Sequence, residues 1–106
     1  DRAEPGEDDY KMAQAMFDSG RFEEAAILFD KTAKIRGFKH IAAAYMYMGV
    51  SYLARINPAN VKEARKLHLK GLACFQNALR FESGVTLPAG YDKYKPVFEE
   101  AKARMR

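Results

Sequence analysis

Three lysines in the second half of the chain are spaced four residues apart, namely Lys62, Lys66 and Lys70. Arg65 lies beside them in the sequence. In a helix this spacing places the cations along one face, where they could bind phosphate groups or acidic side chains. A solvated helix face without a ligand is the more common reason for such a row of lysines, and ligand binding is the alternative interpretation. No aromatic residues are interleaved at the spacing that base stacking requires, and no nucleic-acid-binding module is recognisable, so the pattern disfavours nucleic acid.

The residues that most often carry catalysis form no recognisable motif. Neither His40 nor His68 belongs to a His-x-x-x-His or Glu-x-x-His ligand pair. The sequence contains no Gly-x-Ser-x-Gly elbow and no phosphate-binding glycine loop. Helix-terminus stabilisation explains the adjacent acidic pairs better than acid–base catalysis does; these are Asp8-Asp9, Glu23-Glu24 and Glu99-Glu100. We therefore predict no enzymatic activity, no metal site and no cofactor.

The single cysteine, Cys74, cannot form an internal disulfide. Its apolar neighbours favour a buried packing role over a reactive thiol. The longest apolar-rich stretch, Ile41 to Ala54, is too short to cross a bilayer and is interrupted by Gly49 and Ser51. We therefore predict no membrane span.

Charge is distributed unevenly along the 106 residues. Residues 1–30 hold nine acidic and three basic residues, whereas residues 31–80 hold ten basic residues and one acidic residue. The remainder is nearly balanced, and the net charge is +4. With 48% hydrophobic and 30% charged residues, the composition is that of one globular domain. The basic middle of the chain favours anionic partners.

The elements that must position these residues are helices. Apolar residues recur at helical spacing along nearly the whole chain, and no window alternates as a strand does. Gly20, Gly37 and Ser83-Gly84 punctuate the pattern, and Asn57-Pro58 reads as a helix start. We predict five helices joined by mostly short loops, at 7–19, 21–36, 39–55, 58–82 and 93–105. Short loops make consecutive helices antiparallel neighbours around a shared core.

Residues 39–55 carry a characteristic pattern of bulky and small positions, with Tyr45, Met48-Gly49 and Tyr52 at its bulky, Leu-Gly and Tyr positions. This half-motif resembles the first helix of a tetratricopeptide repeat. Residues 7–36 are similar to a complete but degraded repeat, in which Met12-Ala13, Met16, Gly20, Ala25 and Phe29 occupy matching positions. Asp9 and Thr32 depart from the pattern there, as an end unit would.

The second helix of the second unit departs further from the family. Gly71, Phe75 and Ala78 resemble its pattern, but Gly71 follows Gly49 at a spacing ten residues longer than the family's. We interpret the insertion as roughly three extra helical turns that project beyond the repeat stack. Phe75 to Phe81, Leu87-Pro88 and Pro96 to Ala101 resemble the close of such modules in bacterial envelope proteins. This likeness implies the periplasm or envelope, with the cytoplasm as the alternative.

The family resemblance also implies a binding surface. Tetratricopeptide domains mostly bind peptides or proteins along the concave face formed by their first helices. The matching positions here are Tyr10, Gln14, Phe17, Met46, Tyr47, Val50 and Leu53. This apolar, aromatic set suits an amphipathic helix or an extended apolar peptide. Packing against the final helix or a neighbouring repeat is the alternative. The family's Lys and Asn carboxylate clamp is absent.

Together these patterns predict an all-α domain spanning residues 1–106, with residues 1–6 flexible. Its expected architecture is two degenerate tetratricopeptide-like hairpins, the second with an extended second helix, plus a closing C-terminal helix. The expected function is a protein-interaction or scaffold module. The alternatives are a self-associating spacer, which would be a homo-oligomer, and a binder of an anionic polymer or surface through the basic helix 58–82.

Overall fold

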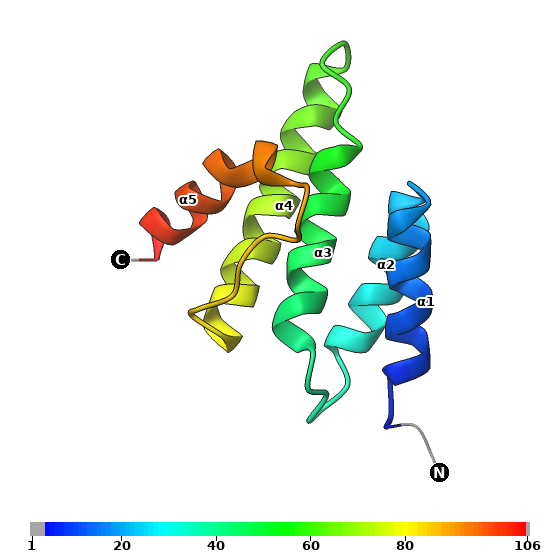
Figure 1. Cartoon of the computed structure of the whole chain (residues 1–106). Helices are drawn as coiled ribbons and strands as arrows, with labels where there is room; N and C mark the ends of the chain where they lie inside the picture. The colour runs from blue at the N-terminus through cyan, green and yellow to red at the C-terminus, as the bar shows by residue number, and fades with distance from the viewer. Residues whose placement is uncertain (1–3, 106) are drawn as a thin grey trace.

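Residues 4–105, the part of the chain that the computed structural model describes, form five α-helices and one short 3-10 helix, η1 (Figure 1). Their bounds are α1 Glu7–Asp18, α2 Phe22–Ala33, α3 Ile41–Ala54, α4 Val61–Phe81, η1 Asp92–Tyr94 and α5 Lys95–Arg104. No strand occurs within the described range. The prediction of an all-helical chain with five helices is confirmed. Residues 1–6 were predicted to be flexible, and residues 1–3 of that segment lie outside the described residues.

The helices follow one another in space in the order of the chain. α1 and α2 run in opposite directions, as do α3 and α4, and each helix packs against the next (Figure 1). α5 packs against α4, and the tip of the α3–α4 hairpin extends beyond α1 and α2 (Figure 1). Residues 82–91, which we call the strap, run from the end of α4 back along the α3–α4 hairpin to the start of η1, which leads into α5 (Figure 1).

The start of α4 differs from the prediction. Asn57-Pro58 does not begin the helix; instead Asn57 Oδ1 accepts a hydrogen bond from the Ala59 N–H at 3.0 Å and shapes a turn. Asn60 is the N-cap, and its Oδ1 accepts from the Glu63 N–H at 3.2 Å. An Asn cap satisfies a first-turn N–H that the helix itself leaves unpaired, so α4 begins three residues later than expected.

The loop between α2 and α3 is also longer than predicted. α2 ends at Ala33 rather than residue 36, and α3 begins at Ile41 rather than residue 39. Gly37 adopts a φ of +81°, a conformation open to glycine at little cost, and it allows the chain to turn there. The turn directs Phe38 into the core, where its side chain is 6% exposed.

Two glycines let α3 and α4 approach closely where they cross. A Cβ atom built on Gly49 would lie 2.4 Å from Phe75 Cε1, and one built on Gly71 would lie 2.8 Å from Leu53 Cγ. Each added Cβ would also lie 3.2 Å from the carbonyl oxygen of the other glycine. The crossing is therefore a contact of backbone against backbone, which any side chain would push apart.

An aromatic cluster joins the first three helices. The Tyr47 ring of α3 stacks on Phe29 of α2, with centroids 4.8 Å apart and planes 5° from parallel. Phe17 of α1 meets Tyr47 edge to face at 4.9 Å, and Tyr10 meets Phe29 at 5.7 Å. Phe29 and Phe17 are 0% and 1% exposed. This cluster fixes how α1 and α2 sit on α3.

Candidate functional site

The residues expected to line an open groove lie mostly inside the protein. Tyr10, Phe17, Met46, Val50 and Leu53 are buried, whereas Gln14 and Tyr47 are half-buried. Leu53 lies beside Gly71 at the α3–α4 crossing. Most of the side chains predicted to line the groove are therefore covered in this structure.

The strap, and not the final helix, covers the face shared by α1 and α3. Tyr91 packs on Phe17 with ring centroids 4.9 Å apart, and Leu87 packs against the buried core. The Val85 side chain is 9% exposed. The sequence pointed to this role through Leu87-Pro88, an apolar pair in a segment that cannot be helical throughout. It did not show that the covered surface would be the expected groove.

A cavity of about 190 Å³ remains between the strap and the two helices. Tyr10, Ala43, Met46 and Tyr47 line one side, and residues 85–88 line the other. The nearest polar arrangement is a long hydrogen bond, 3.4 Å, from Gln14 Nε2 to the Tyr47 hydroxyl. Burial, with smaller contributions from Tyr47 and Glu7, raises the pKa of Tyr10 to about 12. An uncharged and largely apolar lining of this kind suits aliphatic side chains.

The basic residues predicted on α4 lie together on its exposed surface. We call Lys62, Arg65, Lys66 and Lys70 the basic face. Within the described chain none of the four comes within ion-pair distance of a carboxylate. Lys70 Nζ lies 5.5 Å from the centre of the Tyr52 ring, a cation–π contact. Leu69, 54% exposed, follows Arg65 by four positions and Lys66 by three, and so lies among the cations.

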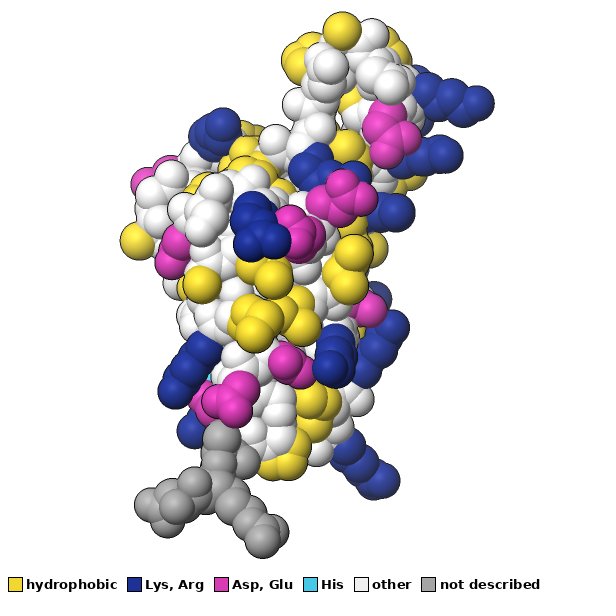
Figure 2. Space-filling model, turned by 90° about the vertical axis from the view of Figure 1, so that its right-hand side faces the viewer, with side chains coloured by type: hydrophobic (Ala, Val, Ile, Leu, Met, Phe, Trp, Pro, Cys, Tyr) yellow, Lys and Arg dark blue, Asp and Glu magenta, His cyan; other side chains and the backbone are white. Residues whose placement is uncertain are grey.

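The α1–α2 side of the molecule has a different character. Figure 2 shows hydrophobic side chains in the middle of this side, with basic and acidic side chains around them. Several acids there are already paired, including Asp9 with Lys31 at 3.1 Å and Asp30 with Lys34 at 2.8 Å. Basic side chains also gather on one side of the projecting α3–α4 tip (Figure 2). The acidic excess of the first 30 residues is therefore partly neutralised within the fold.

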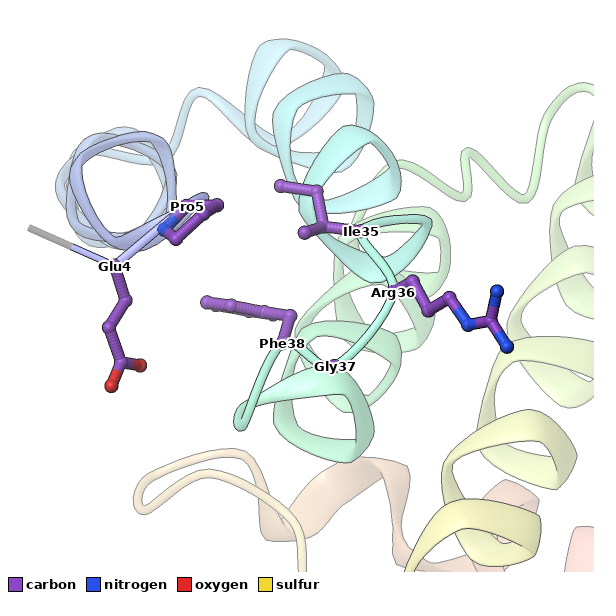
Figure 3. A pocket seen from close by; sticks show the side chains of 6 residues that line it. All are labelled: Glu4, Pro5, Ile35, Arg36, Gly37 and Phe38. Atoms are coloured by element: carbon purple, nitrogen blue, oxygen red, sulfur yellow. The ribbon is translucent and has the colours of Figure 1, made fainter.

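A cavity of about 170 Å³ lies between residues 4–5, which precede α1, and the α2–α3 loop. Pro5, Ile35 and Phe38 point into this space, whereas Glu4 and Arg36 extend away from it (Figure 3). Because the charged side chains of Glu4 and Arg36 are directed away from it, this cavity has no group of polar side chains that could bind a ligand together.

Comparisons of the chain with protein-family models, curated proteins and solved structures found no significant match. Across residues 4–105 no helix is both long enough and apolar enough to cross a membrane. The same range contains no cluster of three or more His, Cys, Asp or Glu residues that could hold a metal ion.

The two histidines each lie beside one carboxylate. His40 Nε2 is 3.4 Å from Glu7 Oε1, and His68 Nε2 is 3.3 Å from Glu100 Oε1. The His40 ring also stacks on Tyr10, with centroids 4.8 Å apart. These pairs join α1 to the start of α3 and α4 to α5, so both histidines connect helices that pack together.

Cys74 should be unreactive in the folded protein. Burial, with a smaller contribution from Asp30, raises the pKa of its thiol from 9.0 to about 12, so the reactive thiolate is scarce at neutral pH.

Because the folded-state pKa values of Cys74 and Tyr10 are both raised, their contribution to stability is fully present below about pH 9 and declines as pH rises towards 12. We expect a thiol-specific reagent at pH 8 to label Cys74 only in urea, and urea midpoints to fall above pH 9. Fast labelling of the folded protein would contradict this prediction.

Proposed function

We propose that the chain is a tetratricopeptide-like interaction module without enzymatic activity that binds an acidic segment of a protein through its basic face. The observation that carries the proposal is the group of four exposed cations, Lys62, Arg65, Lys66 and Lys70, without a carboxylate partner in the described chain. The tetratricopeptide-type arrangement belongs to the same proposal. Its support is the succession of antiparallel helices, each packed on the next.

Aliphatic side chains among the cations favour a protein partner over a nucleic acid. Val61 and Leu69 are 66% and 54% exposed on the same half of α4. A partner helix carrying acidic and aliphatic residues would satisfy both the charges and the exposed apolar area. Single-stranded nucleic acid binds instead through aromatic platforms. Tyr52, the aromatic residue beside Lys70, is half-buried, so little of its ring is available for base stacking.

The basic face is held at some cost to the stability of α4. Lys62, Lys66 and Lys70 form a row of like charges spaced i,i+4, and each such pair is destabilising by roughly 0.2–0.5 kcal/mol. Lys62 also lies in the first turn, two residues after the N-cap Asn60, where the positive end of the helix dipole disfavours a cation. A local arrangement that opposes helix stability is typical of a surface used for binding.

Lys62→Glu should therefore raise the free energy of unfolding by about 0.5–1.5 kcal/mol, because it places an acid at the helix start and pairs that acid with Lys66 in the favourable i,i+4 direction. Urea unfolding followed by circular dichroism measures the change. Lys95→Asp at the first turn of α5 provides a comparison, since it makes a similar charge reversal at the start of a different helix. A destabilised Lys62→Glu variant would contradict the electrostatic account.

Binding can be tested with a labelled synthetic peptide that carries Glu and Leu at helical spacing. We expect Lys62→Glu/Lys66→Glu to weaken binding at least tenfold, and we expect wild-type affinity to fall as salt rises from about 50 to about 200 mM. The matched control is Lys11→Glu/Lys95→Glu, which changes net charge equally at exposed positions elsewhere. Equal losses in both variants, or preference for a single-stranded oligonucleotide over the peptide, would refute the proposed surface.

A further inference from the structure

The strap is attached to the helices that it covers by side-chain packing alone. Two of its backbone hydrogen bonds are internal turns, from the Val85 N–H to the Glu82 carbonyl at 3.1 Å and from the Tyr91 N–H to the Pro88 carbonyl at 3.2 Å. Its two end residues are joined to the flanking elements, by the Glu82 N–H to the Ala78 carbonyl at 2.9 Å and by the Tyr94 N–H to the Tyr91 carbonyl at 3.1 Å. Within the described residues, no backbone hydrogen bond joins residues 83–90 to a helix, and no strap side chain forms a hydrogen bond or ion pair. Lifting the strap would thus break no polar interaction.

A pocket that is partly open to solvent lies on each side of the strap. The cavity of about 190 Å³ lies between it and α1 and α3, and a second cavity of about 260 Å³ lies between it and α5. Thr86 and Leu87 line both cavities. Both spaces are partly open to solvent, so Thr86 and Leu87 contact the helices over only part of their surface.

The surface beneath the strap is by contrast held rigidly. Tyr47 is fixed by its stack on Phe29, and Tyr10 by edge-to-face contacts with Phe29 and Phe38. Met46 is 1% exposed. Release of the strap would therefore uncover a preformed apolar surface, which is what a binding site for an apolar peptide requires.

We propose that the strap is a displaceable intramolecular occupant of a peptide-binding face formed by α1 and α3. The ligand of this face is a non-helical protein segment with the chemistry of the strap, in which two aliphatic residues two positions apart precede a proline, as in Val85-Thr86-Leu87-Pro88. The residue before a proline avoids the helical conformation, so the occupant itself specifies an extended rather than a helical ligand. This site is separate from the basic face and does not depend on it.

The tethered strap has an effective concentration on the order of millimolar, so a free peptide competes poorly until the strap is weakened. The probe is a labelled synthetic peptide with the sequence of residues 82–92. We expect negligible binding to the wild-type protein and at least tenfold tighter binding to Val85→Ser/Leu87→Ser, measured by fluorescence anisotropy. Glu82→Ser/Ala89→Ser, which changes two exposed strap residues, should behave as wild type. The Met46 methyl resonance should shift on binding.

Three results would overturn the proposal. A folded Val85→Ser/Leu87→Ser variant that binds the peptide no better than wild type would show that the covered face is not a site. Loss of helical circular dichroism in that variant would show that the strap is an integral part of the core. Peptide binding that leaves the Met46 methyl unmoved, or tighter binding of a helix-forming apolar peptide, would refute the assigned location or ligand.

Discussion

Phe29→Ala should lower the free energy of unfolding by about 3–5 kcal/mol, the largest loss expected from a single substitution in this protein. Phe29 is 0% exposed and contacts the rings of Tyr10, Phe17 and Tyr47, so its removal leaves a cavity where α1, α2 and α3 meet. The parallel stack with Tyr47 would be lost as well. Urea unfolding monitored by far-ultraviolet circular dichroism measures the change.

Ile27→Ala is the matched control, because Ile27 is an apolar residue of the same helix that is 69% exposed. We expect its effect to stay within about 0.5 kcal/mol. Similar losses in the two variants would mean that α2 does not use the Phe29 side of the helix to pack on α1 and α3.

Gly49→Ala should destabilise the fold by about 1–3 kcal/mol even though alanine is the better helix former. The added methyl group would lie 2.4 Å from the ring of Phe75, which is 0% exposed, and 3.2 Å from the Gly71 carbonyl oxygen. The ring can move only by disturbing its edge-to-face contact with Phe98 of α5. We therefore expect the substitution to loosen the attachments of both α3 and α5 to α4.

A double-mutant cycle with Phe75→Leu separates this clash from other causes. The smaller side chain should make room for the methyl group, so Gly49→Ala should be less harmful in the Phe75→Leu background than in wild type. Gly84→Ala is the control, because a Cβ there would meet no atom within 4 Å. Additive effects of Gly49→Ala and Phe75→Leu would rule out the clash as the cause.

The helices were predictable from sequence because their signal is local. Helical spacing of apolar residues decided their number, and Gly20 and Gly37 marked real turns, both with positive φ. The predicted start of α4, at residue 58, was wrong because Asn57-Pro58 and Asn60 are both plausible helix starts. Only the hydrogen bond from Glu63 to Asn60 separates these alternatives.

The candidate site was harder to predict because it depends on a contact between distant segments. Family spacing located the face of α1 and α3 but could not show that residues 85–91, far along the chain, lie on it. Predicting the basic face did not require knowledge of contacts between distant segments. Helical periodicity alone placed Lys62, Lys66 and Lys70 together, and all three lie on the surface.

The packing of each helix on its neighbour in the chain also has a consequence for the order of folding. Such contacts close short loops and form quickly, as is typical of helical proteins with low contact order. The contact between Phe17 and Tyr91 joins residues that are far apart in the sequence, and closing a longer loop carries a larger entropy loss. The helices should therefore assemble before the strap docks, so that the nascent protein passes through a stage in which the face of α1 and α3 is still uncovered.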